Sequence, residues 1–186
     1  MKFWYNDKTM LKVKNFKPRF FAKKAGLPPG DVDQGEHGYQ EEGTALRLIR
    51  YHARGFKTED VTDLDVITRA TEQERLWLRV RGLGDIALLK AVCDVIGLHK
   101  LHLEDILSPY LRPKLEKISR GLFFVGTHYE IEETSELFSG RNLSIFFSDR
   151  LLVSFESLKD PILDTIEERI VKQSGVIHEK SLNYLF

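Results

Sequence analysis

The sequence predicts one α/β domain that is built on a mixed β-sheet. Segments of strand length come early in the chain, segments with helical periodicity lie between strands, and two strands joined by a short turn come late. This order lacks the regular alternation of strands and helices that a doubly wound parallel sheet requires. A chain of 186 residues is long enough to bury a sizeable core within one domain.

The composition is ordinary for a soluble globular protein and gives little support to several partner classes. Hydrophobic residues make up 42% of the chain and charged residues 30%. Basic and acidic residues are equal at 28 each, so the overall charge gives no reason to expect nucleic acid or an acidic membrane as a partner. The single cysteine, Cys93, excludes an internal disulfide and fits a reducing compartment. We expect no signal peptide and no membrane span, because no apolar run approaches the ~20 residues of a membrane helix.

Residues 1–25 are predicted to form a basic aromatic arm ahead of a domain that covers residues 26–186. Eight of the first 24 residues are lysine or arginine, the single acid is Asp7, and aromatic residues are interleaved with them. Such an arm either touches phosphate groups or a lipid surface, or is a solvated tail. The Gly26-Leu-Pro-Pro-Gly30 segment marks a turn at the boundary, and residues 31–43 are predicted to form a loop.

The first part of the domain is predicted to contain two strands and a short helix or turn. Residues 45–51 alternate apolar residues with arginines, which predicts a strand with one solvated face. Residues 57–65 carry acids and threonines, and we expect a short helix or a turn there. Residues 76–80 are predicted to form a second strand with Trp77 on one face.

A helix with signals at both ends follows the second strand. Asp85 is placed to cap its first turn and Gly97 to end it. Apolar residues recur between them at helical spacing, at Ile86, Leu89, Val92, Cys93 and Ile96. The preceding Gly82-Leu-Gly84-Asp85 resembles a phosphate-binding loop but lacks the third glycine and the lysine of the known fingerprints. We interpret it as a turn between strand and helix.

The second part of the domain is predicted to be rich in strands. We expect strands at residues 114–118 and 122–129, and a hairpin of residues 142–147 and 151–155 joined by residues 148–150. Asn142-Leu-Ser144 matches a glycosylation sequon, but it lies in a predicted strand and has no secretory context, so we treat the match as chance.

A helix is predicted to follow the hairpin. Asp160 and Pro161 supply an N-cap and a first helical residue for a helix that runs to about Lys172. Its expected buried face consists of Ile162, Leu163, Ile166 and Ile170. Residues 177–186 begin another helical pattern without a stop signal, so we expect the chain to be a fragment of a longer protein.

Residues 99–116 form the most informative segment. Leu103, Ile106 and Leu107 are spaced to bury one face of a short helix, and we expect Leu101 to join this apolar ladder. Pro109 ends the helix near residues 107–108, and Pro113 sets a second turn before the next strand. Glu104 and Asp105 then point toward solvent or a partner.

The charged residues of this segment allow more than one chemistry. His99, His102, Glu104 and Asp105 lie close enough in sequence for a transition-metal site, which a small metal-dependent enzyme would use. Carboxylates without nitrogen or sulfur ligands prefer hard cations such as Mg²⁺. Arg112 and Lys114 flank Pro113, and we expect them to form structural ion pairs with Glu116 or Glu104.

The same segment resembles the H-P-L-x-x-E-D-x-x-x-x-x-x-R-P-K-L-E signature of the CorA-type magnesium transporters. The matching residues are His99, Leu101, Glu104, Asp105, Arg112, Pro113, Lys114, Leu115 and Glu116. Lys100 replaces the usual proline, and its charge opposes cation binding nearby. Trp77-Leu-Arg-Val80 followed by Gly82 resembles the family's Trp-Ile-(Asp/Asn)-(Ile/Val)-x-Gly strand end, and the Gly26–Gly30 turn resembles one that precedes the family's first strand.

The resemblance implies a cytoplasmic N-terminal domain whose mixed sheet is sandwiched between helical layers. It implies a homopentamer in the plasma or inner membrane, with membrane helices C-terminal to residue 186. It also implies that Asp105, with Glu104 nearby, binds a regulatory Mg²⁺ between subunits.

These implications lead to a regulatory function rather than a catalytic one. We expect the divalent-cation-sensing domain of a magnesium/cobalt channel-transporter, with divalent cations and further copies of the chain as partners. The equivalent domain of a ZntB-type zinc transporter is the alternative. Less favoured are a metal-dependent enzyme that uses the His99, His102, Glu104 and Asp105 cluster, and a binding module that uses the arm at residues 3–21.

Overall fold

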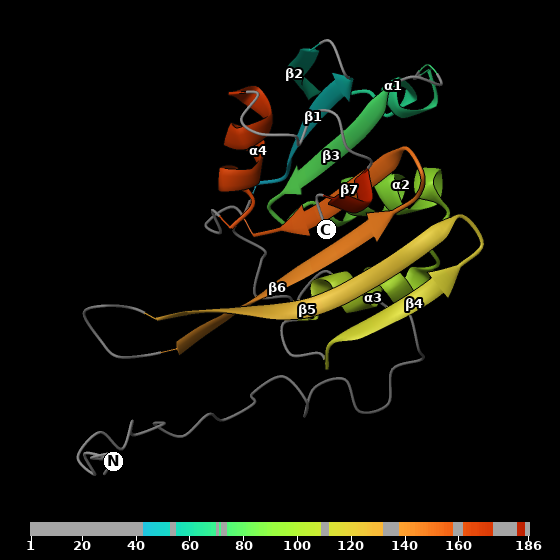
Figure 1. The fold of residues 1–186 in the computed structure, drawn as a ribbon. Helices are drawn as coiled ribbons and strands as arrows, with labels where there is room; N and C mark the ends of the chain where they lie inside the picture. The colour runs from blue at the N-terminus through green and yellow to red at the C-terminus, as the bar shows by residue number, and fades with distance from the viewer. Residues whose placement is uncertain are drawn as a thin grey trace, which may run out of the picture.

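A single seven-stranded sheet organises the computed structural model of the chain (Figure 1). The structure describes residues 43–52, 55–69, 71, 74–108, 112–131, 138–157, 162–172 and 182–184. The strands are β1 (Ala45–His52), β2 (Gly55–Val61), β3 (Arg75–Arg81), β4 (Lys114–Ile118), β5 (Gly121–Ile131), β6 (Phe138–Phe147) and β7 (Leu151–Glu156). The helices are α1 (Asp65–Thr68), α2 (Ile86–Ile96), α3 (Lys100–Leu107), α4 (Asp164–Val171) and the short 3₁₀ helix η1 (Leu182–Tyr184).

The strand order is β2-β1-β3-β7-β6-β5-β4, and it confirms the predicted mixed sheet. The central strands β3 and β7 are parallel, whereas the other neighbouring pairs are antiparallel. The predicted hairpin of β6 and β7 is present, and the backbone N–H of Ser148 donates to the carbonyl of Leu151 across its turn at 2.8 Å.

The prediction of a helix or turn at residues 57–65 is wrong over most of its length. Residues 55–61 form the edge strand β2, which pairs with β1 from Leu46–Val61 to His52–Gly55. An edge strand keeps one side in water, so it accepts charged residues that would be costly in a central strand. Cross-strand pairing, including an Arg50–Glu59 ion pair of 3.0 Å, outweighs the weak strand propensity of these residues.

The predicted ends of α2 are confirmed. The carboxylate of Asp85 accepts a hydrogen bond from the backbone N–H of Leu88 at 2.9 Å, which satisfies one free donor of the first turn. Gly97 ends the helix in the left-handed conformation, with φ of 78°. The residues before the helix therefore form the turn and cap that we predicted.

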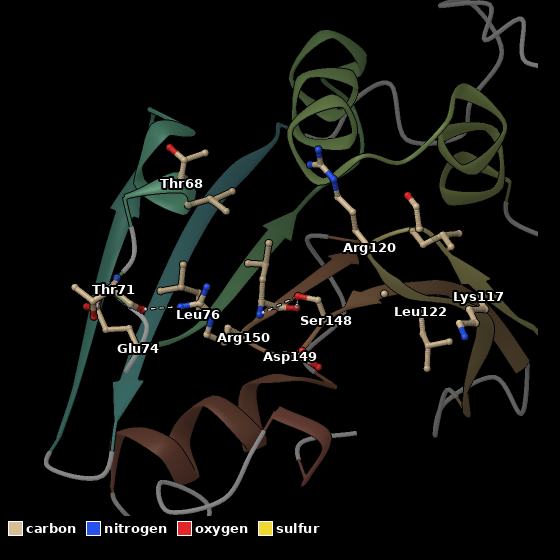
Figure 2. A pocket seen from close by; sticks show the side chains of 15 residues that line it. Thr68, Thr71, Glu74, Leu76, Lys117, Arg120, Leu122, Ser148, Asp149 and Arg150 are labelled. Carbon is tan, nitrogen blue, oxygen red and sulfur yellow. Dashed lines mark hydrogen bonds between the residues drawn. The ribbon is translucent and has the colours of Figure 1, made fainter.

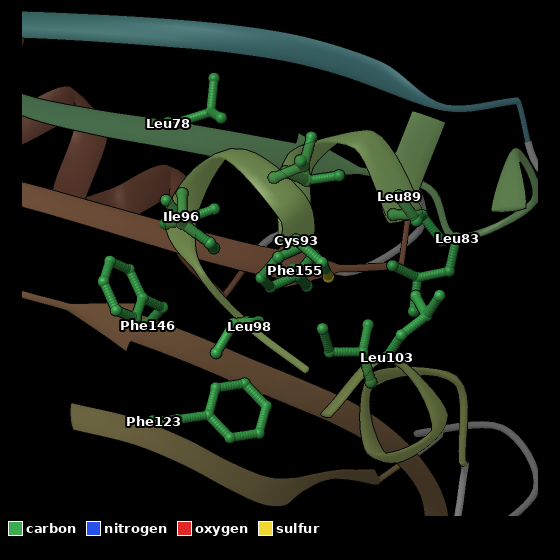
Figure 3. Close-up of a cluster of buried hydrophobic side chains, with 14 of the residues drawn as sticks. Leu78, Leu83, Leu89, Cys93, Ile96, Leu98, Leu103, Phe123, Phe146 and Phe155 are labelled. Atoms are coloured by element: carbon green, nitrogen blue, oxygen red, sulfur yellow. The ribbon is translucent and has the colours of Figure 1, made fainter. Parts of the chain in front are cut away.

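Two apolar clusters lie on opposite faces of the sheet. One cluster packs α2 and α3 against the sheet, and Figure 3 shows Leu103 of α3 and Ile96 of α2 near Phe123 and Phe146. The other cluster joins Trp77 and Leu152 of the sheet to Leu163 and Ile170 from the α4 region. The described part of this second face thus carries α4 and η1, and a complete second helical layer stays a prediction.

Several predicted features lie outside the described residues. They are the arm at residues 1–25, the turn at residues 26–30, and the helix start at Asp160 and Pro161. The predicted buried residues of the helix after this start do pack in the second cluster.

Candidate functional site

Helix α3 is anchored by the apolar face that its sequence predicts. Leu103, Ile106 and Leu107 are buried, with at most 4% of each exposed. Leu101, which was expected to join them, is 43% exposed, because its position turns it away from the sheet. The helix ends at Leu107, close to the predicted end. This anchoring fixes which way the residues between the apolar positions face.

The two histidines cap the first turn of α3. His99 Nδ1 accepts a hydrogen bond from the backbone N–H of Leu101 at 3.3 Å, and His102 Nδ1 accepts one from the backbone N–H of His99 at 3.0 Å. The His102 ring also packs edge-on against Phe123, with 4.9 Å between the ring centroids. Because the Nδ1 atom of each ring accepts a hydrogen bond from the backbone, both residues stabilise the start of the helix.

A buried asparagine holds the other end of α3. Asn142 of β6 places its Nδ2 at 2.9 Å from the carbonyl of Asp105, 3.0 Å from that of Ile106 and 2.9 Å from that of Ser108. Helix C-termini leave carbonyls without partners, and the two N–H bonds of this amide lie within reach of three of them. Asn142 is only 2% exposed, which agrees with reading its sequon as a chance match. The carbonyls at this helix end therefore already have a donor.

An ion-pair group surrounds Asp105 just beyond these carbonyls. The Nζ atom of Lys114 lies 2.5 Å from Asp105 Oδ2 and 3.5 Å from Glu116 Oε2. The predicted Lys114–Glu116 pair is thus confirmed, and the shorter contact to Asp105 is one that sequence spacing did not indicate. Partial burial alone would lower the pKa of Lys114, but the hydrogen bonds and charges of Asp105 and Glu116 outweigh it and raise the pKa above its usual value.

The two predicted metal-site residues differ in their surroundings. The Asp105 side chain is 19% exposed and faces Lys114 from β4, whereas Glu104 is half-buried beside it on α3. Glu116 approaches the same ammonium from β4 and also lies 3.6 Å from His102 Nε2. Among the described residues, no three histidine, cysteine, aspartate or glutamate side chains converge closely enough to hold a metal ion. One copy of the described chain therefore offers at most part of a coordination sphere.

A cavity of about 820 Å³ lies elsewhere, near one end of the sheet (Figure 2). Residues from the α1 region, the β4–β5 turn and the β6–β7 turn line it, among them Thr68, Arg120 and Arg150. None of His99, His102, Glu104 and Asp105 is among its lining residues. This cavity therefore does not provide the concave site that the enzyme interpretation of those four residues requires.

A second charged group lies between α4 and the central strands, and no sequence pattern indicated it. Arg79 of β3 is fully buried, and its guanidinium contacts Glu156 of β7 together with Asp164 and Glu167 of α4. Arg47 of β1 also contacts Glu167, at 2.6 Å. These side chains come from segments far apart in the sequence, so only the folded structure shows their pairing. They join α4 to the central strands.

Comparison with known proteins shows what this chain is similar to. No protein-family model matches the chain. Over 168 residues it is 26% identical to the cobalt/magnesium transport protein CorA of Thermotoga maritima. The aligned region covers 90% of this chain and 47% of that protein. The chain is similar to CorA over most of its own length. It spans about half the length of the curated relative that it matches.

Solved structures support the fold. The full-length CmaX protein matches with a TM-score of 0.55 and 18% identity, over 73% of this chain and 41% of that one. The CorA magnesium transporter of Methanocaldococcus jannaschii matches with a TM-score of 0.55 and 15% identity, over 75% of this chain and 41% of that one. In the part of the chain that the structure describes, no helix has both the length and the apolar character needed to cross a membrane.

Proposed function

We propose that this chain is the cytoplasmic regulatory domain of a CorA-type magnesium/cobalt channel-transporter, and that it senses divalent cations through Asp105. The observation that carries the proposal is that the Asp105 carboxylate, at the end of α3, already binds a cationic group, the Lys114 ammonium, at 2.5 Å. A helix C-terminus favours positive charge, so the helix itself supports cation binding at this place. The CorA relationship supports the choice of transport over other functions of an α/β domain.

The donor chemistry favours a hard divalent cation. Asp105 and Glu116 flank the same ammonium, and Glu104 lies beside Asp105 on the helix, so the nearby acids supply oxygen ligands. Mg²⁺ prefers such ligands and keeps several waters when it binds, whereas zinc sites are built mainly from cysteine and histidine. The Nδ1 atoms of His99 and His102 are engaged by the helix start. We therefore place Mg²⁺ ahead of the zinc alternative.

The site needs a second copy of the chain to be complete. Mg²⁺ takes six ligands, and one copy offers at most a few carboxylate oxygens here. Carboxylates that face each other across an interface repel, and a bound cation turns that repulsion into attraction. We propose that the cation binds between neighbouring subunits of a homopentamer and shifts the population toward one arrangement of them.

We also propose that the sheet lies between two helical layers in the whole transporter and that the domain is on the cytoplasmic side of the membrane. On the edge strand β4, Leu115 is 62% exposed on the face opposite α2 and α3, which is apolar surface that a second layer would cover. The curated relative is about twice as long as the matched region, which leaves room for further helices.

A Mg²⁺ titration followed by backbone amide NMR tests the proposal. We expect chemical shifts at residues 103–108 and 114–116 to change with millimolar Mg²⁺, and Asp105→Asn to abolish the change. Asp94→Asn is the matched control, because Asp94 is an exposed aspartate on the neighbouring helix α2. A wild-type chain without Mg²⁺-dependent shifts in this region, or shifts that Asp105→Asn leaves intact, would overturn the proposal.

A further inference from the structure

We propose that Lys114 is an internal competitor for the cation site, and that a divalent cation binds Asp105 only by displacing the Lys114 ammonium. This inference rests on the proposed function. It adds a residue that sets the cation concentration to which the site responds. The Nζ atom of Lys114 lies 2.5 Å from Asp105 Oδ2, so it occupies the position of a cation bound to that oxygen.

The backbone oxygens at this helix end already have a hydrogen-bond donor. The Nδ2 atom of Asn142 already occupies the carbonyls of Asp105, Ile106 and Ser108. A cation therefore depends on the Asp105 carboxylate rather than on backbone oxygens. That carboxylate is only 19% exposed, and one of its oxygens is in contact with Lys114. A divalent cation that binds this oxygen therefore takes the place of the ammonium.

The Lys114 side chain is also able to move away from Asp105. Its side chain is 40% exposed and comes from β4, which is an edge strand of the sheet. Glu116, with 48% of its side chain exposed, lies 3.5 Å from the same ammonium and offers it a second acceptor nearer to solvent. A lysine side chain has a flexible stem with a compact charge, so the move requires no change in the strand. Displacement of Lys114 also removes a positive charge that would repel the divalent cation.

The size of the effect follows from simple competition. A ligand that must displace an internal group binds more weakly. The loss in affinity equals the factor by which that group prefers to occupy the site rather than leave it. The hydrogen bond between the Lys114 ammonium and the Asp105 carboxylate, discounted for the exposure of Lys114, should weaken Mg²⁺ binding by roughly tenfold. Removal of the ammonium should therefore lower the half-saturating Mg²⁺ concentration by about tenfold.

The test compares three lysine variants in the same NMR titration with Mg²⁺. Lys114→Met keeps the apolar stem and removes the charge, and we expect its half-saturation to fall about tenfold. Lys114→Arg keeps a positive charge and should stay near the wild-type value, which separates the charge from any effect on folding. Lys117→Met is the matched control, because Lys117 is an exposed lysine on the opposite face of the same strand.

The outcomes separate this inference from the proposed function. If Asp105→Asn abolishes the response while Lys114→Met binds no more tightly than Lys117→Met, the competitor role is wrong and the sensing site stands. If wild type and all variants ignore Mg²⁺, both ideas fail. If Lys114→Met and Lys114→Arg weaken binding equally, Lys114 supports the site's structure and does not compete for it.

Discussion

Arg79 and Glu156 form a fully buried bidentate ion pair that joins the two parallel central strands. Arg79 Nε lies 2.8 Å from Glu156 Oε1 and Nη2 lies 2.6 Å from Oε2, and neither side chain is exposed. Burial opposes the charge on Arg79, but its hydrogen bonds to Glu156, Glu167 and Asp164 hold its pKa above the usual value. Since Asp164 and Glu167 belong to α4, the guanidinium also ties this helix to the sheet.

Removal of this guanidinium should be strongly destabilising. Arg79→Met leaves Glu156 buried without its partner, and we expect a loss of about 3–5 kcal/mol in the free energy of unfolding. Urea denaturation followed by circular dichroism measures it. The double variant Arg79→Met/Glu156→Met should recover most of the loss, because a pair of apolar side chains leaves no buried charge between the strands. A single variant within about 1 kcal/mol of wild type would contradict the structure.

Asn142 should matter more than its neighbour Ser144 on the same strand face. Asn142→Ala removes the amide whose Nδ2 lies within hydrogen-bond distance of three carbonyls at the α3 end, and we expect a loss of about 1–3 kcal/mol in the free energy of unfolding. Ser144→Ala is the control, because its buried Oγ has no hydrogen-bond partner in the structure and its loss should cost little. Equal destabilisation of the two variants, measured by thermal unfolding, would argue against the capping role of Asn142.

Replacement of Gly97 by alanine should destabilise the chain more than replacement of Gly55. Gly97 has φ of 78°, and a Cβ there would lie 3.2 Å from the Cδ atom of Arg120. We expect Gly97→Ala to cost about 1 kcal/mol or more, since left-handed backbone is unfavourable for alanine. A Cβ at Gly55 meets nothing within 4 Å, and no positive φ requires glycine there. Denaturant midpoints of the two variants check this, and a larger loss for Gly55→Ala would be incompatible with the described turns.

The Cys93 thiol should be inert in the folded chain. Burial, with a smaller contribution from Asp94, raises the pKa of Cys93 from 9.0 to about 12. The folded chain therefore keeps a proton that the unfolded chain releases, so this group lowers stability as the pH rises above 9.0 toward 12. Iodoacetamide at about pH 9 should modify the urea-unfolded chain quickly and the native chain only at its unfolding rate. Rapid modification of the native chain would show that Cys93 is accessible.

Local signals in the sequence predicted much of the fold. Asp85 and Gly97 marked the ends of α2, and the spacing of Leu103, Ile106 and Leu107 gave the buried face of α3. These predictions succeeded because the capping residues and the apolar spacing on which they depend lie within one helical segment. The strand β2 was missed because its pairing with β1 outweighs its own propensity.

Long-range pairs account for what sequence reasoning could not find. Arg79 meets Glu167 across 88 positions of the chain, and no spacing rule connects them. At the candidate site, the sequence placed Asp105 on the outward side of α3 but gave no sign that Lys114 would reach it from β4. That contact depends on the place of β4 at the sheet edge.

Sedimentation velocity with and without millimolar Mg²⁺ tests the central claim most directly, for wild type, Asp105→Asn and Asp94→Asn. We predict that Mg²⁺ shifts wild type and Asp94→Asn toward larger species, and that Asp105→Asn stays unchanged. Self-association of Asp105→Asn to the same extent as wild type would contradict an inter-subunit cation site at Asp105. A wild-type chain whose sedimentation is indifferent to Mg²⁺ would contradict the claim that the cation joins copies of this domain.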